Sequence, residues 1–383
     1  MWPTRVRRVL SQAGDPAWVV TDYDLVRTLL TEPRLVSTHP DPQRAPRVSE
    51  SVILGGPLPE SPTEAEDHAR MRRLLGRSFS AAGLERVRPR VVALTDEVLD
   101  DLAAAPKPAD FHEIVSYPLP AFTICELFGV PRADREDFRR WSEESADMLD
   151  GARSMNGLAS LTKYLSGLIT RRLTEPGDDV LTEVAEAHRL EPEAFPLETA
   201  AELCAGLLFA GHETTVSAID AGLVMVMTHP EQRAKLLASP ELIPGAVEEM
   251  LRIGVPESTL ATASISERVP GLPRWAKVTF DIDGVTIPEG DLVLLGLQQA
   301  NHDPYLLGSQ RGFEIERRPN PHLTFGHGKH YCIGAPLARL ELRVLFEALL
   351  ARFPAIEPAV PVDRLPLRHA MVAGGLASLP VTW

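Results

Sequence analysis

One segment constrains this chain more than any other: Phe325-Gly326-His327-Gly328-Lys329-His330-Tyr331-Cys332-Ile333-Gly334, in which glycines surround a single cysteine. Glycines let the backbone turn closely around a thiolate and aim N–H groups at its sulfur. Cys332 also lies just before a predicted helix over 335–350, whose positive N-terminal end would stabilise a thiolate. The segment therefore predicts a shielded, metal-binding thiolate. The alternative is a buried structural cysteine in a glycine-rich turn.

The composition is that of an ordinary globular protein: 383 residues, 44% hydrophobic and 24% charged. A chain of this length can bury a large core, including a cofactor. No stretch approaches about 18 consecutive apolar residues, and the N-terminus has no apolar region of a signal peptide, so we expect a cytoplasmic protein. Three cysteines are too few and too scattered for a disulfide framework, which fits a reducing cytosol. A net charge of −14 argues against nucleic-acid binding.

Sequence periodicity predicts a mostly helical chain. The first 36 residues have the pattern of short strands and a helix over Tyr23 to Leu30. Residues 38–66 are rich in Pro, Ser and Glu, which is typical of a long loop. A helical pattern then runs from Glu66 to about Ala105 and continues, with short Pro and Gly breaks, to about Leu251.

A small strand-rich part is expected over residues 277–296. There Asp283-Gly284 separates two short runs of alternating apolar residues, which predicts a β-hairpin. A last long helix begins near Gly334, and no linker divides the chain. We therefore expect one domain over residues 1–383 that is mostly α with a small β-rich part.

A second chemically informative segment is Ala210-Gly211-His212-Glu213-Thr214-Thr215, within an apolar predicted helix over about 200–227. Threonine hydroxyls compete for backbone hydrogen bonds, so a local break of the helix is expected there. Such a break would leave room for a small ligand beside Thr214. The alternative is a helix N-cap or a polar turn that faces solvent.

Two further segments carry charged pairs at helical spacing. Glu249 and Arg252 stand at i, i+3 on one predicted helix face, and His68 and Arg72 stand at i, i+4 on another. By themselves these patterns also fit an exposed ion pair and a solvated basic helix.

Taken in order, these segments resemble the motifs of the cytochrome P450 family, in its bacterial, actinobacterial-like class. The resemblance spans Trp18 to about Pro354. It implies the cytochrome P450 fold, a single triangular-prism domain with a buried heme b. It also implies a heme-thiolate monooxygenase that oxidises, above all hydroxylates, a small organic substrate of secondary metabolism. The chain begins without the short helix that usually precedes the family's first strand.

The same resemblance implies a role for each motif. Cys332 would bind the heme iron as a thiolate, which is the ligand type of this family. Thr214 would hydrogen-bond the dioxygen that the cofactor activates, and Glu213 would belong to the proton-delivery route. Glu249, Arg252 and an arginine at the matching position, Arg317, would form a buried network that holds the heme loop. The remaining implied cofactor contacts are His68, Arg72, Arg274 and His330 for the propionates, and Phe325, Gly326 and Ala210 around the ring.

These motifs do not identify the substrate or the type of oxidation. The pocket would be formed by residues 38–66, 150–170 and 253–265, and the stretch between Arg252 and Arg274 is longer than usual for the family. That stretch is either a pocket-lining loop or a surface insertion, and its length makes Arg268 a rival of Arg274. Oxidative coupling, another non-hydroxylating oxidation and a non-catalytic heme-thiolate binding protein are the alternative functions.

The resemblance finally implies ferredoxin and ferredoxin reductase as electron donors. Arg70, Arg73 and Arg77 recur at i, i+3 and i+7, so they predict a basic stripe on an otherwise acidic protein. With Lys329 and Arg343, this stripe would steer an acidic partner by its positive field. The alternative is an ordinary solvated helix face.

Overall fold

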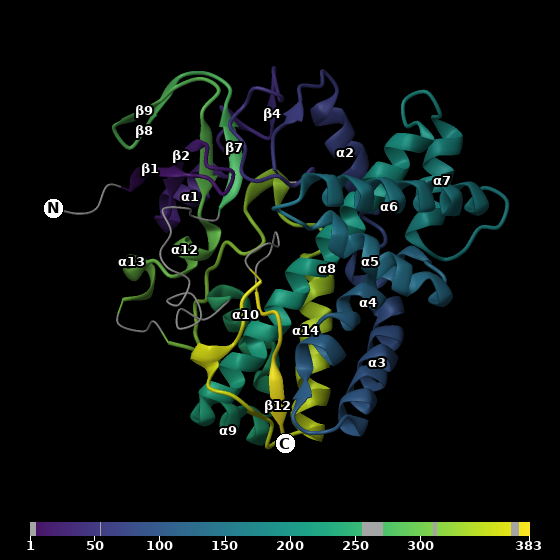
Figure 1. The fold of residues 1–383 in the computed structure, drawn as a ribbon, viewed down its shortest axis with the longest axis vertical. Helices are drawn as coiled ribbons and strands as arrows, with labels where there is room; N and C mark the ends of the chain where they lie inside the picture. Colours follow the sequence, from purple (N-terminus) through teal and green to yellow (C-terminus); the bar gives the residue numbers. More distant parts are fainter. Residues whose placement is uncertain (1–4, 54, 255–270, 309–311, 369–374) are drawn as a thin grey trace.

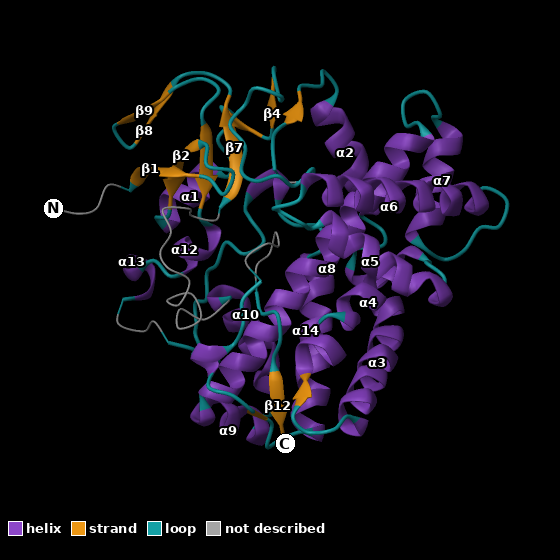
Figure 2. Ribbon diagram, in the orientation of Figure 1, coloured by secondary structure: helices purple, strands orange, loops and turns teal. Residues whose placement is uncertain are grey.

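The computed structural model describes residues 5–53, 55–254, 271–308, 312–368 and 375–383. Most strands gather at one end of the molecule, and helices fill most of the remainder (Figures 1 and 2). The expected mostly helical fold with a small β-rich part is confirmed.

The largest sheet joins strands from the start of the described chain with strands from residues 272–295. Its strand order is β1-β2-β10-β7-β3, and only the β2–β10 pair is parallel. The bounds are β1 Val6–Leu10, β2 Pro16–Val20, β3 Leu35–Val36, β7 Leu272–Ala276 and β10 Leu292–Leu295. Because β10 pairs with both β2 and β7, it fixes Arg274 on β7 opposite Val293.

Three small sheets complete the β-rich part. The predicted hairpin is confirmed, because Asp283 and Gly284 both take positive φ, at 50° and 79°, between two paired strands. The strands are β4 Thr38–His39 with β5 Leu58–Pro59, β8 Phe280–Ile282 with β9 Val285–Ile287, and β6 Ala109–Asp110 with β12 Pro380–Thr382 and β11 Glu357–Pro358.

The helices surround one long central helix, α8. The bounds are α1 Tyr23–Leu29, α2 Glu64–Leu75, α3 Ala81–Ala104, α4 Pro118–Phe128, α5 Arg135–Ser145, α6 Gly151–Arg172, α7 Val180–Leu190, α8 Leu197–Thr228, α9 Pro230–Ala238, α10 Ile243–Ile253, α12 Leu297–Asn301, α13 Pro304–Leu307 and α14 Ala335–Arg352. A π-helical turn, His112–Ser116, precedes α4. Helix α8 packs against α4, α6, α10 and α14, so it is the axis of the core.

Close packing around α8 explains a glycine in its second half. A Cβ on Gly222 would lie 2.7 Å from the Phe346 ring and 3.0 Å from the Met250 sulfur. Because such distances are too short for real contacts, only glycine lets α8 approach α14 and α10 this closely.

The predicted helix from Glu66 to about Ala105 is wrong in one respect: the structure divides it. Helix α2 ends at Leu75, and α3 begins at Ala81 after the Ser80 side chain accepts a hydrogen bond from Gly83 N at 3.1 Å. Ser80 is therefore an N-cap that starts a new helix. This division also puts Arg77 beyond the end of α2.

Candidate active site

The loop before α14 is folded tightly around Cys332. The Cys332 N–H donates to the Phe325 carbonyl at 2.9 Å, which closes the loop on itself. Gly326 and Gly328 take positive φ, at 73° and 74°, and a Cβ on Gly328 would also collide with the Thr31 side chain. These glycines are therefore required by backbone conformation and by space, as the sequence indicated.

Cys332 differs from the other two cysteines in its exposure. Cys125 and Cys204 are buried, whereas Cys332 is exposed although it lies at the start of a core helix. Desolvation by the surrounding protein raises the pKa of the Cys332 thiol, and the N–H groups of Gly334 and Ala335 oppose that rise. The expected backbone donors are present, but in the protein alone desolvation outweighs them. A positive metal ion at the sulfur would reverse that balance.

Helix α2 and the Cys332 loop bring basic side chains together. His68 and Arg72 lie one turn apart on α2. The His68 and His330 rings lie 4.5 Å apart, centroid to centroid, and an Arg72 Nη donates to the Tyr331 carbonyl at 3.0 Å. The two predicted propionate-binding residues of α2 therefore contact the loop that carries the cysteine.

Arg274 and Lys329 complete this basic cluster. Burial lowers the pKa of Arg274, and the side-chain bond found for it goes to the carbonyl of Pro273 at 2.8 Å. Burial, with the charges of His68, Lys329, Arg274 and Arg72, lowers the pKa of His330 to about 4. Among the described residues, no carboxylate lies within 4 Å of these basic side chains, His68, Arg72, Arg274, Lys329 and His330. We call these five residues the unpaired basic cluster; they suit a ligand with acidic groups.

Helix α8 has an open stripe in its middle. Ala210 and Thr214 are exposed, while Phe209 and Glu213 beside them are buried. Residues four apart share a helix face, so the stripe is one open side of an otherwise buried helix. The predicted break of the helix is wrong: α8 continues without interruption from Leu197 to Thr228, although the Thr214 hydroxyl bonds the Ala210 carbonyl at 2.9 Å.

Glu213 lies on a different face of α8 and is only 2% exposed. Its carboxylate lies 3.6 Å from an Arg368 Nη, which is an ion-pair distance but too long for a hydrogen bond. Burial raises the pKa of Glu213, and Arg368 partly opposes that rise. No pattern in the sequence pointed to Arg368, which lies far along the chain from Glu213.

His212 fastens this part of α8 to its neighbours. Its Nε2–H donates to the Tyr117 carbonyl at 3.0 Å, and its Nδ1 lies 3.2 Å from the Ser142 hydroxyl. Burial lowers the pKa of His212 to about 4, so the ring is neutral and Nδ1 accepts from the hydroxyl. The fully buried ring thus fixes the rotation of α8 that places Thr214 on its open side.

The predicted network of Glu249, Arg252 and Arg317 is confirmed. Arg252 bonds both carboxylate oxygens of Glu249, at 2.7 and 2.8 Å, and Arg317 Nε reaches them at 3.1 and 3.2 Å. Glu249 and Arg252 are fully buried. Arg252 also bonds the Asn301 carbonyl at 3.0 Å, and the Asn301 side chain accepts from Leu323 N at 2.6 Å. The network therefore supports the chain just before Phe325.

A second anchor of the loop escaped the sequence reasoning. Glu248 receives two parallel bonds from Arg339, at 2.7 and 2.8 Å, and lies 3.2 Å from His322 Nε2. Burial would raise the pKa of Glu248, but His322 and Arg339 lower it to about 2. Arg339 also covers the Phe325 ring at 4.5 Å and bonds the Tyr331 hydroxyl. The i, i+3 spacing of the neighbouring pair drew attention to Glu249 and away from Glu248.

The predicted basic stripe is wrong as a continuous surface. Arg70 pairs with Asp67 at 3.2 Å, and Arg77 lies 3.9 Å from Glu183 on α7. Arg343 lies 3.8 Å from the carboxylate of Glu248. Arg70 and Arg77 therefore have acidic partners of their own, and Arg343 shares Glu248 with Arg339. Arg73 and Lys329 are exposed and have no acidic partner among the described residues.

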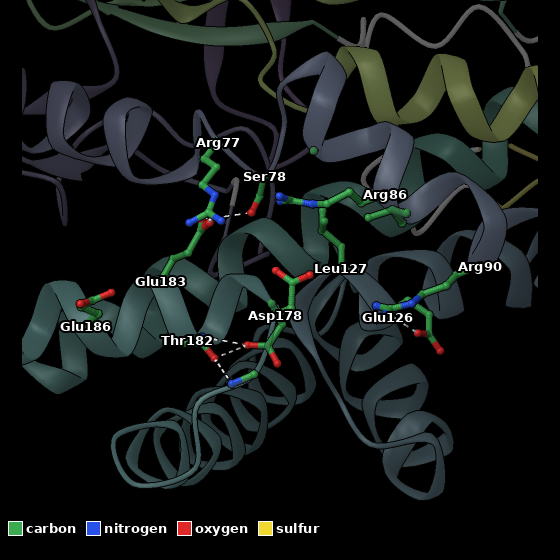
Figure 3. A pocket seen from close by; sticks show the side chains of 14 residues that line it. Arg77, Ser78, Arg86, Arg90, Glu126, Leu127, Asp178, Thr182, Glu183 and Glu186 are labelled. Atoms are coloured by element: carbon green, nitrogen blue, oxygen red, sulfur yellow. Dashed lines mark hydrogen bonds and ion pairs between the residues drawn. The ribbon is translucent and has the colours of Figure 1, made fainter.

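Arg77 instead lines a polar pocket of about 260 Å³ between α3, α4 and α7. Figure 3 shows Arg77, Arg86 and Arg90 facing Glu126, Asp178, Glu183 and Glu186 across it. The opposite charges compensate one another, and no residue predicted to bind the cofactor lines this pocket. The predicted pocket segment after Arg252, with Arg268, lies mostly outside the described residues.

The chain is similar to known proteins over almost its whole length. The cytochrome P450 family profile matches residues 177–372. Mycinamicin IV hydroxylase/epoxidase of Micromonospora griseorubida is 38% identical over 383 residues, which cover 99% of this chain and 92% of that protein. The chain belongs to the cytochrome P450 family.

Other relatives agree over similar lengths. Pentalenolactone synthase of Streptomyces exfoliatus is 36% identical over 377 residues, 97% of this chain and 91% of that protein. The solved structure of the mycinamicin VIII C21 methyl hydroxylase of Micromonospora griseorubida, bound to mycinamicin VIII, has a TM-score of 0.85 at 33% identity and covers 100% of this chain and 94% of that one. The resemblance inferred from the motifs is thus confirmed, and this cytochrome P450 is a heme-thiolate monooxygenase.

Within the described residues, every helix is too short or too polar to cross a membrane.

Proposed function

We propose that this cytochrome P450 hydroxylates a small organic substrate of secondary metabolism, with heme b held by Cys332 and electrons from a ferredoxin and its reductase. The observation that carries the proposal is the unpaired basic cluster beside the Cys332 loop. Relatives with the printed names hydroxylase/epoxidase and methyl hydroxylase support the reaction type. We further propose that residues 1–383 form one domain that works in the cytoplasm, where its three unpaired cysteines would remain reduced.

The residues present fit a heme, which needs a ligand for its iron and hydrogen-bond donors for its propionates. Cys332 supplies the thiolate for the iron, and the N–H groups of Gly334 and Ala335 stabilise its charge. His68, Arg72, Arg274 and His330 supply donors for two propionates, which charge-assisted bonds favour. Phe325 and Gly326 belong to the loop that would lie against the ring, and Ala210 leaves space on α8. When bound, the heme supplies electron transfer and oxygen activation.

The chain's own residues would control the delivery of protons to the site. Thr214 presents a hydroxyl on the open stripe of α8, where it can donate to an oxygen outside the helix instead of the Ala210 carbonyl. Glu213, with a pKa raised by burial, can hold a proton nearer to neutral pH than an exposed carboxyl. Together they offer a donor and a proton store on adjacent positions of one helix.

A second candidate function is an oxidation without hydroxylation, such as coupling. The printed name of one relative, pentalenolactone synthase, supports it. Glu213 and Thr214 serve both reactions, so analysis of the product separates them.

Thr214→Ala tests the proposed proton control. Without its hydroxyl the variant should still consume reductant, but peroxide should rise at the expense of organic product. The ratio of product to reductant consumed is the quantity to measure. Thr170→Ala is the matched control, because its hydroxyl is also exposed and makes the same type of bond to a carbonyl four residues earlier, but it lies on α6 and not on the open stripe of α8. An unchanged ratio in Thr214→Ala would contradict the role proposed for this residue.

A further inference from the structure

A charged pair that α8 shares with the C-terminal segment is not explained by cofactor binding. The Arg368 guanidinium lies 3.6 Å from the buried Glu213 carboxylate and 5.5 Å from the centre of the Tyr117 ring. The Arg368 side chain is 13% exposed. The backbone N–H of Arg368 donates to the Gly375 carbonyl at 2.9 Å, which fixes the backbone that carries the side chain.

Tyr117 connects this pair to the surface. Its ring is nearly buried, and a second guanidinium, that of Arg139, lies 5.4 Å from the ring centre. The Tyr117 hydroxyl lies 3.4 Å from a carboxylate oxygen of Glu143, whose side chain is 44% exposed. Two cations thus hold the ring, while its hydroxyl points to a carboxylate that solvent reaches.

Arg368 dominates the surroundings of Glu213. One Glu213 oxygen is buried and has no hydrogen-bond partner among the described residues, so a neighbouring charge acts on it with little screening. The other charged groups that influence it are Glu143, which disfavours its ionised form, and His112, which favours it. His112 is itself bound to Asp220 at 2.7 Å, so much of its charge is compensated there.

We propose that Arg368 is a positioning residue for Glu213: it holds the carboxylate on the Tyr117 side of α8, where buried Tyr117 leads to the partly exposed Glu143. Glu213 would take up its proton on that side and would have to leave Arg368 to pass the proton toward Thr214. The charge of Arg368 therefore stabilises the ionised form of Glu213 between proton transfers. The inference rests on the proposed function only for the final use of that proton.

The test is the protonation of Glu213 itself, read without turnover. Infrared difference spectra between each protein and its Glu213→Gln form give the carboxylic acid band of Glu213 as a function of pH. In Arg368→Gln the band should persist to a pH higher by about one to three units, because an opposite charge at this distance is lost. Arg368→Lys keeps the charge and should titrate close to wild type.

Arg364→Gln is the matched control, because Arg364 lies four residues away in the same segment, is exposed and has no ion pair among the described residues. It should leave the band unchanged. A titration that stays at the wild-type pH in Arg368→Gln would overturn the inference, and so would an equal shift in Arg364→Gln.

Turnover of the same variants separates this inference from the proposed function. A shifted band with a lower ratio of product to reductant consumed supports both. A shifted band with an unchanged ratio supports Arg368 as the positioning residue and contradicts the proton role proposed for Glu213.

Discussion

Two arginines from neighbouring regions of this cytochrome P450 show how differently a buried cation can be accommodated. Arg252 on α10 is fully buried, and Glu249, Asn301 and Gly312 take up its donors. Arg274 on β7 is well covered too, but the carbonyl of Pro273 is the acceptor found for it among the described residues. A cation with all its partners inside the protein has a structural role. A cation that is desolvated and lacks an acid is suited to bind an acidic group from outside.

The largest expected effect is a loss of stability in the network of Glu249, Arg252 and Arg317, where each charge has a partner. Arg252→Met should lower the free energy of unfolding by about 3–5 kcal/mol, because the Glu249 charge would stay buried after losing its main partner. Denaturant unfolding of the purified protein measures this. Arg189→Gln is the control, because it removes an exposed pair with Glu186 at 3.6 Å and should change stability little. A loss in Arg252→Met as small as in the control would mean that Arg317 alone compensates Glu249.

The opposite result is expected at Arg274. Arg274→Met should leave the unfolding free energy of the heme-free protein unchanged or higher, since a partly desolvated charge without a carboxylate partner is removed. Heme should dissociate about 10–100-fold faster, which corresponds to the loss of one charge-assisted bond. Transfer of heme to an acceptor protein gives the rate. Equal heme release from Arg274→Met and wild type would show that Arg274 does not bind a propionate.

How much of this was predictable depends on the range of the interactions. The loop glycines, the Glu249–Arg252 pair and the Asp283-Gly284 hairpin depend on neighbours within a few residues, and the sequence indicated each of them correctly. The split between α2 and α3 was missed, although Ser80 is an ordinary capping residue, because apolar periodicity continues across it.

Long-range partners left no comparable signal. Arg368 reaches Glu213 across 155 positions of sequence, and Arg339 reaches Glu248 across 91. Arg77 looked like part of one basic face with Arg70 because its acidic partner, Glu183, comes from α7, 106 positions later, whereas Arg70 also has a partner on its own helix, Asp67. Periodicity describes one helix at a time, so it cannot show which charges a second helix neutralises.

A smaller effect, dependent on pH, should mark the unpaired basic cluster. Because the folded pKa of His330 is about 4 and an unfolded histidine has about 6.5, the unfolded chain binds more protons between these values. Stability from this residue is therefore complete above pH 6.5 and declines as pH falls toward 4. His330→Asn should flatten this decline in heme-free protein, measured as unfolding free energy against pH. An equal slope in both proteins would contradict the prediction.

The smallest effect is expected from the neutralised arginines. Arg77→Glu should hardly change the rate of reduction by ferredoxin at low salt, because Glu183 already compensates Arg77. Lys329→Glu should slow it, since Lys329 is exposed beside the Cys332 loop, and added salt should erase the difference. Stopped-flow reduction at two ionic strengths measures both. A larger loss for Arg77→Glu than for Lys329→Glu would place the docking surface near α7 instead.

The central claim, that Cys332 binds the heme iron as a thiolate, is tested most directly by the carbon monoxide difference spectrum of the reduced protein. Wild type and Cys125→Ala, which alters a buried cysteine away from the loop, should show the red-shifted Soret band typical of thiolate ligation. Cys332→Ala and Cys332→His should both lose it. A red-shifted band that survives either substitution at Cys332 would contradict the account.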